Sequence, residues 1–212
     1  FILVQHSLQE RMTLMNAEIL TALAIFAFVS SITPGPNNLM LMNSGANYGF
    51  NRTLPHALGV GIGFTVMVAL VGLGIMQLFD IFPISYQILK VLSIVYLLYL
   101  AGKIAMSNSS IETDNSNAKP FTFVQAAMFQ WVNPKAWTMA LTAISVYAPT
   151  KSLGAVLFVS LAFGLVNFPC ISGWVVLGQK MQVFLTNKKR LRVFNGSMAA
   201  LLVLSLYPVL LD

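Results

Sequence analysis

Two proline-containing motifs hold the residues that could do chemistry in this sequence, Thr33-Pro34-Gly35-Pro36-Asn37-Asn38 and Val132-Asn133-Pro134-Lys135-Ala136. Each motif interrupts a long apolar run. Proline lacks a backbone donor and clashes with the carbonyl four residues before it. It also pushes the preceding residue away from helical dihedral angles. Both motifs therefore predict an unwound turn inside an otherwise helical segment.

The first motif has the composition of an anion site. An unwound turn frees carbonyls on one side and amides on the other, and in lipid both must face protein or a water-filled cavity. Freed amides at the start of a half-helix favour an anion such as a carboxylate, and asparagine adds side-chain donors and acceptors. The alternative is a purely structural kink. We expect a substrate site that includes Pro34, Gly35, Pro36, Asn37 and Asn38.

In the second motif, Lys135 is the only ionisable residue deep in any apolar run. It lies roughly 21 Å of helical rise after Phe121. A charge near the bilayer centre costs at least about 2.5–3.5 kcal/mol on insertion scales, so it faces the protein interior by default. A substrate carboxylate, freed carbonyls and water are its expected partners, because no acid lies at that depth. The alternative is a lysine that snorkels to the interface. We expect Asn133, Pro134 and Lys135 to complete the site.

The composition places these motifs in a membrane. Of the 212 residues, 57% are hydrophobic and 8% are charged, against about 25% charged in ordinary soluble domains. The chain is therefore expected to sit in a lipid bilayer. Its net charge of +6 forms no face or stripe, so no nucleic-acid partner is expected. The single cysteine, Cys170, excludes a disulfide scaffold.

Six apolar runs are long enough to cross a bilayer core, which takes about 20 residues per helix. They are residues 17–42, 54–79, 84–106, 121–148, 153–178 and 191–211. We therefore predict an all-α, polytopic membrane protein. Each set of three begins with a proline-broken helix, helices 1 and 4, and an odd number of spans per set implies inversion. Such pairs are typical of a transport site at the membrane midplane, so we predict a 3+3 inverted repeat.

The same pattern divides the chain and orients it. We expect an N-terminal tail at 1–15, a first repeat at 16–106, a cytoplasmic linker at 107–120 and a second repeat at 121–212. The tail is interpreted as an upstream extension, with Met12 or Met15 as the start. Eight Lys and Arg follow helices 1, 3 and 5, against three on the opposite side. The positive-inside rule then predicts that both termini face outward.

Several classes of chemistry lack their residues in this sequence. There is no phosphate-binding Gly-rich Lys motif, no Ser/His/Asp set and no HExxH motif. His6 and His56 are 50 residues apart, and the only carboxylate within the apolar runs is Glu18, at the start of the first run. A divalent-metal exporter would be expected to use such ligands. We therefore predict no catalytic residues, no metal site and no cofactor.

With these motifs in place, the chain resembles the LysE/RhtB family of bacterial amino-acid exporters over roughly residues 12 to 212. The resemblance rests on the two motifs, the glycines of 59–63, the third-helix pattern of 89–103, and on Gly45, Tyr48-Gly49-Phe50, Arg192, Asn195 and Gly196. It looks closest to the cysteine and O-acetylserine exporter branch. Many members have Asp where this chain has Asn37, so a carboxylate at that position is not available here for proton coupling.

The resemblance implies a secondary transporter rather than an enzyme. It would export a small neutral amino acid or derivative, of the cysteine/O-acetylserine or homoserine/threonine type, across the cytoplasmic (inner) membrane with the proton as coupling ion. The substrate carboxylate would bind between the two breaks with Lys135 as counter-charge, and Lys135 would release the proton. The small-xxx-small glycines of helix 2 pack within the monomer or in a homodimer. A metal-ion exporter and a structural membrane subunit are the alternatives.

Overall fold

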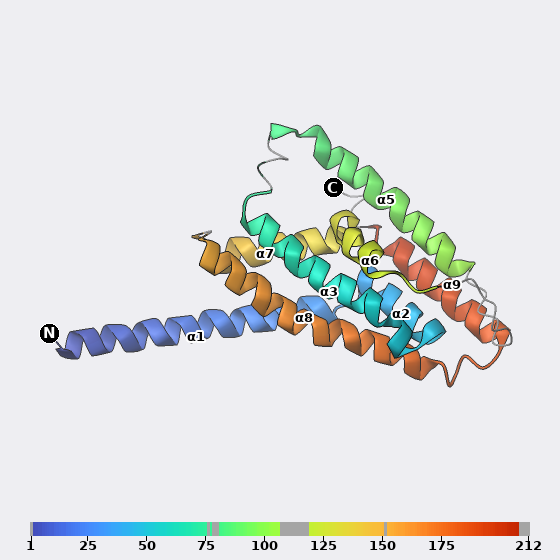
Figure 1. Cartoon of the computed structure of the whole chain (residues 1–212), viewed down its shortest axis with the longest axis horizontal. Coiled ribbons are helices and arrows are strands. Elements are labelled where there is room, and N and C mark those ends of the chain that lie inside the picture. The colour runs from blue at the N-terminus through green and yellow to red at the C-terminus, as the bar shows by residue number, and fades with distance from the viewer. Residues whose placement is uncertain (1, 76, 78–80, 107–118, 151, 208–212) are drawn as a thin grey trace.

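The computed structural model describes residues 2–75, 77, 81–106, 119–150 and 152–207, with side chains from residue 17 onward. Every regular element in these ranges is a helix (Figure 1). The elements are α1 (Ile2–Ile32), α2 (Pro36–Tyr48), α3 (Phe50–Gly72), α5 (Ile84–Ala105), α6 (Phe123–Phe129), the 3₁₀ helix η1 (Gln130–Val132), α7 (Pro134–Tyr147), α8 (Leu153–Met181) and α9 (Lys188–Leu204). The all-α prediction is confirmed.

Both predicted helix breaks are present. α1 ends at Ile32 and α2 begins at Pro36, with a bend of 56° between the two helices. η1 ends at Val132 and α7 begins at Pro134. In each case a proline occupies the first helical position, where its missing N–H is not needed and its fixed φ suits the helix. The sequence therefore located both interruptions correctly.

Three helices are long and apolar enough to cross a membrane, namely α3, α5 and α8, and the bent pair α1–α2 makes a fourth if it is one span. This count is restricted to the described residues, and it makes the chain a multi-pass membrane protein. The predicted linker 107–120 falls outside the described part for residues 107–118. The predicted ends of helix 2, at 76 and 78–79, and of helix 6, at 208–211, also fall outside it.

The helix ends differ from the predicted runs in several places. α3 extends over Phe50–Gly72 rather than 54–79, and α9 already begins at Lys188. α1 already begins at Ile2, because no Gly or Pro precedes Pro34 to interrupt a helix. Figure 1 shows this N-terminal part extending away from the other helices. α2 continues to Tyr48, and the chain reverses at Gly49, whose φ of 78° is in the region that favours glycine. α8 continues to Met181.

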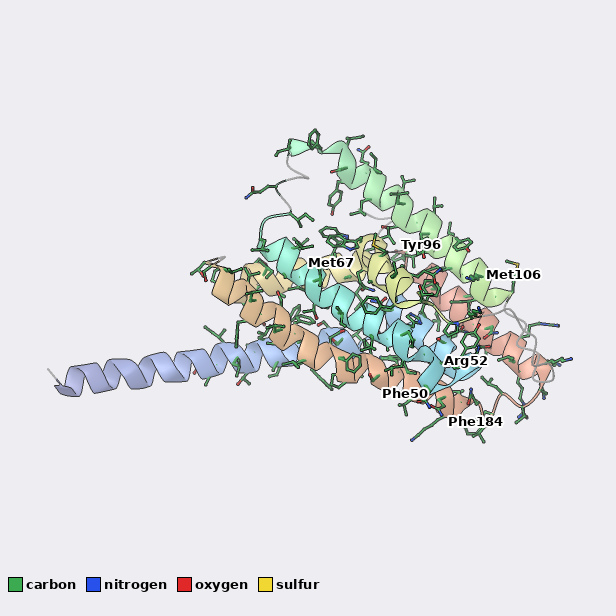
Figure 2. All side chains as sticks on the ribbon, viewed as in Figure 1. Phe50, Arg52, Met67, Tyr96, Met106 and Phe184 are labelled. Carbon is green, nitrogen blue, oxygen red and sulfur yellow. The ribbon has the colours of Figure 1, made fainter. Side chains whose placement is uncertain are left out.

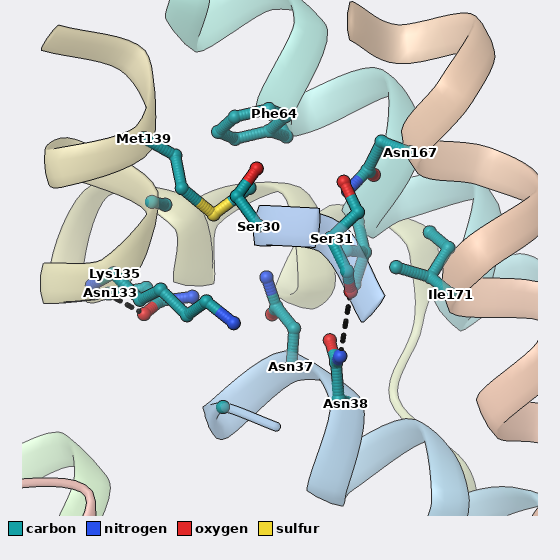
Figure 3. A pocket seen from close by; sticks show the side chains of 13 residues that line it. Ser30, Ser31, Asn37, Asn38, Phe64, Asn133, Lys135, Met139, Asn167 and Ile171 are labelled. Carbon is teal, nitrogen blue, oxygen red and sulfur yellow. Dashed lines mark hydrogen bonds between the residues drawn. The ribbon is translucent and has the colours of Figure 1, made fainter. Parts of the chain in front are cut away.

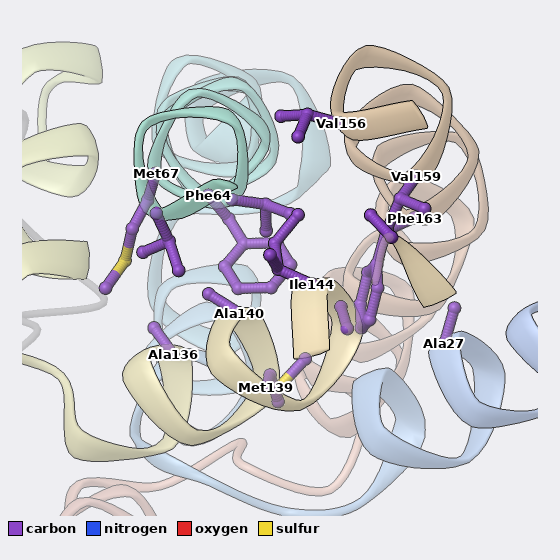
Figure 4. Packing of buried hydrophobic residues seen from close by; sticks show 14 of the residues in the cluster. Ala27, Phe64, Met67, Ala136, Met139, Ala140, Ile144, Val156, Val159 and Phe163 are labelled. Carbon is purple, nitrogen blue, oxygen red and sulfur yellow. The ribbon is translucent and has the colours of Figure 1, made fainter. Parts of the chain in front are cut away.

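α8 is the central helix of the bundle and packs against α1, α2 and α3, while α5 packs mainly on α9. The largest apolar cluster fills the space between α1, α3, α7 and α8 (Figure 4). Within it the rings of Phe64 and Phe163 meet edge to face with centroids 5.1 Å apart, a favoured aromatic geometry. This packing fixes α1, α7 and α8 around the two breaks.

The glycines of α3 bring it close to α6. A Cβ on Gly59 would lie 2.8 Å from the Cβ of Ala126, and one on Gly63 would lie 2.6 Å from the Cα of Ala127. The small-xxx-small pair is therefore used inside the monomer, as close helix approach requires. It holds α6, and with it the second break, against the bundle.

The C-terminal ends of α2, α5 and α8 lie at one end of the bundle (Figure 1). Figure 2 shows Arg52, Met106 and Phe184 at that end. Arg52 lies 5.5 Å from the ring centroid of Tyr48, within cation–π range. The segments that carry most of the predicted cytoplasmic Lys and Arg thus share one end of the molecule.

Candidate substrate site

A small cavity lies between the two helix breaks (Figure 3). It is lined by Ser30 and Ser31 of α1, Gly35, Asn37 and Asn38, Val60 and Phe64 of α3, Asn133, Lys135, Ala136 and Met139, and Asn167 and Ile171 of α8. Its volume is about 20 Å³, which is room for one water molecule. The cavity is therefore closed in this conformation.

The carbonyls freed at the end of α1 are bound by side chains from three other helices. Asn38 Nδ2 donates to Ser31 O at 2.8 Å and to Thr33 O at 3.0 Å. Trp174 Nε1 of α8 donates to Ile32 O at 3.3 Å. Side chains thus replace the helical donors that Pro34 and Pro36 remove, as the apolar surroundings require.

Lys135 supplies the remaining donor to these carbonyls. Its Nζ donates to Thr33 O and lies 3.5 Å from Pro34 O. The side chain is half-buried and lines the cavity. It reaches the first break by passing over Gly35, where a Cβ would lie 2.6 Å from its Cδ. Among the described side chains it has no ion-pair partner, so its charge is met only by backbone oxygens.

The amides at the start of α2, unlike the carbonyls at the end of α1, are not bound by described protein groups. Pro36 has no N–H, and within the described ranges no acceptor reaches the backbone N–H groups of Asn37 and Asn38. Side-chain oxygens cap α6, α7, α8 and α9, whereas none caps α2, α3 or α5. The first turn of a helix carries a partial positive charge. The start of α2 therefore presents backbone donors beside Lys135 that no described protein group uses.

At the second break, Asn133 bonds the backbone groups at the start of α7. Asn133 Oδ1 accepts from Lys135 N at 3.2 Å, and Asn133 O accepts from Ala136 N at 3.0 Å. The Asn133 side chain is 2% exposed. This cap starts α7 immediately before Lys135, and so fixes where the lysine leaves the backbone.

An amide pair joins the two breaks. Asn37 Nδ2 donates to Gln130 Oε1 at 2.8 Å, and Gln130 Nε2 donates back to Asn37 Oδ1 at 3.2 Å. Gln130 is fully buried, and its Nε2 also donates to Ala126 O at 2.8 Å. This second bond sets the orientation of the Gln130 amide, and hence that of Asn37.

The chain is similar in sequence to known proteins. The LysE type translocator family matches residues 28–206. The cysteine/O-acetylserine efflux protein of Escherichia coli (strain K12) is 28% identical over 170 residues, which cover 79% of this chain and 86% of the relative. The protein of the same name from Salmonella typhimurium (strain LT2) is 29% identical over the same length. No solved structure matches the chain.

The chain belongs to the LysE type translocator family. The protein is therefore a membrane transporter and not an enzyme. The matched region of this translocator contains both breaks and every residue that lines the cavity.

The structure of the translocator brings the predicted residues together at the cavity. Five of them line it: Gly35, Asn37, Asn38, Asn133 and Lys135. The prolines 34, 36 and 134 form the breaks and do not line it. The side chains of Asn37 and Asn38 are bonded to protein groups, so the free donors at α2 are the backbone amides.

Four polar residues around the site were not predicted: Ser30, Ser31, Gln130 and Asn167. Ser31 and Ser30 precede the first break by less than one turn, and Gln130 precedes Asn133 by three residues. Residues three or four apart share a helix face. That spacing was the signal available for these three. Asn167 is an isolated polar residue beside Pro169 in an apolar run, a pattern typical of a hydrogen-bonding core position.

Proposed function

We propose that this LysE type translocator exports a small neutral amino acid or derivative across the cytoplasmic membrane of a bacterium. The expected substrates are of the cysteine/O-acetylserine or homoserine/threonine type, and the path runs between the two broken helices. The names of the curated relatives, cysteine/O-acetylserine efflux proteins, support the substrate class. The cavity residues support the location.

One observation carries the proposal. At the first break the carbonyls of Ser31, Ile32 and Thr33 are bound by protein donors, whereas the amides of Asn37 and Asn38 are not. A site whose acceptors are satisfied and whose donors are open binds an anion. With an adjacent lysine cation, the group that fits is a carboxylate.

Lys135 is proposed as the switch between the empty and loaded states. Its bonds to the carbonyls of Thr33 and Pro34 have neutral acceptors, whereas a carboxylate carries a full negative charge that attracts the ammonium group more strongly. An arriving carboxylate therefore draws Nζ away from α1. When the carboxylate leaves, Lys135 can release a proton or return to the carbonyls. We place proton coupling at this residue, since Asn37 offers no carboxyl group.

Transport requires the cavity to open, since about 20 Å³ does not admit an amino acid. The contacts that hold it closed join α2 to η1 and α7 to the end of α1. We propose that these contacts break and re-form as the two halves of the molecule rock about the site, as in other transporters with midplane sites.

The proposed architecture has six spans in a 3+3 inverted repeat, with repeats at 16–106 and 121–212. The broken spans are α1–α2 and α6–η1–α7, followed in each half by two more helices. The shared location of the C-terminal ends of α2, α5 and α8 supports a cytoplasmic face there (Figure 2). By the positive-inside rule both termini would face outward. A homodimer stays a prediction.

Export from intact cells tests the function. Cells expressing the translocator are loaded with dipeptides, and each released amino acid is followed over time. We expect one or a few small neutral amino acids to leave faster than from cells without it. Equal rates at good membrane expression would refute the proposal.

Two lysine substitutions distinguish an effect on the site from an effect on folding. Lys135→Met removes the cavity cation, while Lys103→Met removes a lysine that lies 5.8 Å from the Phe121 ring, away from the cavity. We expect loss of export in the first variant and near-normal export in the second. Normal pH-driven export by Lys135→Met would exclude both the binding and the coupling role of this residue.

A further inference from the structure

The side chain of Asn167 leaves one polar atom without a partner. It is 5% exposed, and its Nδ2 donates to Ser31 Oγ at 2.9 Å. Its Oδ1 is buried and has no hydrogen-bond partner among the described residues. A buried acceptor without a donor is destabilising. Such an atom in a cavity wall is therefore evidence for a ligand group that donates to it.

Asn167 faces the anion site from the opposite wall. Figure 3 shows Lys135 on one side of the cavity, Asn167 on the other, and Asn37 and Asn38 below the space between them. The start of α2 and Lys135 provide donors and positive charge. The wall formed by α1 and α8 provides the oxygen of Asn167 and no cation. The two walls therefore suit opposite ends of a dipolar molecule.

We infer that Asn167 Oδ1 accepts a hydrogen bond from the α-ammonium group of the substrate. This inference rests on the proposed function and adds the residue that would hold the ammonium end of the substrate. Ser30 lies on the same wall, and its Oγ donates to Phe26 O at 2.6 Å. Its lone pairs stay available as a second acceptor.

The rest of the wall limits the substrate side chain. Val60, Phe64, Met139 and Ile171 are apolar, and each is less than 10% exposed. They leave no charged partner for an acidic or basic side chain. The site therefore identifies both charged ends of a small amino acid and accepts a short neutral side chain between them.

Analogues of cysteine that lack one charged end test the inference. The purified full-length translocator is reconstituted in liposomes, and exchange of labelled cysteine is measured under reducing conditions. Unlabelled 3-mercaptopropionate, which lacks the ammonium, and cysteamine, which lacks the carboxylate, serve as competitors. For the wild type we expect cysteine to compete roughly 10- to 100-fold better than either analogue, the range for one hydrogen bond to a charged group.

Asn167→Leu keeps the approximate volume and removes the acceptor. We expect cysteine to compete no better than 3-mercaptopropionate in this variant, while 3-mercaptopropionate itself is unchanged. Ser160→Ala is the matched control, since Ser160 is buried in α8 and bonds only Val156 O. Its cysteine preference should equal that of the wild type.

The outcomes separate the two proposals. If Asn167→Leu keeps the wild-type preference, or weakens cysteine and 3-mercaptopropionate equally, the ammonium contact is wrong while the export function stands. If the wild type exchanges none of the small neutral amino acids, the proposed function fails, and the inference fails with it. Thermal unfolding in detergent shows whether each variant is folded.

Discussion

The amide pair between Asn37 and Gln130 gives the most quantitative prediction. Its two hydrogen bonds, of 2.8 and 3.2 Å, directly connect side chains of the two broken helices. Asn37→Leu and Gln130→Met are approximate isosteres that each remove one partner. Each single change also leaves a polar atom of the other residue unpaired, whereas the double change leaves none from this pair.

The expected coupling follows from the bond count. A hydrogen bond contributes roughly 0.5–1.5 kcal/mol net, so two bonds give a coupling of about 1–3 kcal/mol. For a chain of this size 1 kcal/mol shifts the melting temperature by about 2–4 °C. The double variant should therefore melt about 2–12 °C higher than the sum of the two single shifts predicts.

Thermal unfolding of the purified protein in mild detergent measures this cycle. Gln130→Met combined with Ser160→Ala is the control, because Ser160 bonds only Val156 O within α8, and distant changes add. If the melting-temperature shifts of the Asn37 and Gln130 variants add, within the error of the control pair, the two side chains are not coupled. The proposal that this contact opens during transport would then lose its structural basis.

Three further changes test the elements around the site. Gly35→Ala places a Cβ 2.6 Å from Cδ of Lys135; the lysine must shift, so export should fall several-fold at nearly unchanged melting temperature. Asn133→Ala removes the cap of α7 and should cost about 1 kcal/mol of stability, measured by the same melting assay. Gly63→Leu cannot pack against Ala127; we expect poor yield of folded protein by size-exclusion chromatography, and a normal elution profile would contradict the α3–α6 contact.

The sequence predicted those features that depend on backbone chemistry. Proline at 34, 36 and 134 excludes a continuous helix, and both breaks occur where predicted. Apolar run length predicted membrane helices, and the extended α1 shows the limit of that signal. Length and hydropathy mark where lipid can be crossed, whereas the ends of α1 and α2 are set by Pro34 and Gly49.

The sequence could not predict which side chains of distant segments pair. Asn37 and Gln130 are 93 residues apart, and Asn167 and Ser31 are 136 apart. Nothing local indicates which buried amide meets which carbonyl, because that depends on how α2, η1 and α8 pack. The expectation that Asn37 and Asn38 offer their side chains to substrate left out this competition, in which protein groups use those amides first.

The two breaks both precede a helix that begins with proline, and they differ in the capping residue. Asn133 precedes Pro134 and caps α7 with its own side chain. Gly35 precedes Pro36 and has no side chain, so α2 starts with open amides. The same glycine lets Lys135 pass from the second break to the first. In the proposed site one break therefore supplies the cation and the other receives the anion. A site divided in this way suits the proposed binding and release of one small zwitterion, since two open helix starts would attract two anions.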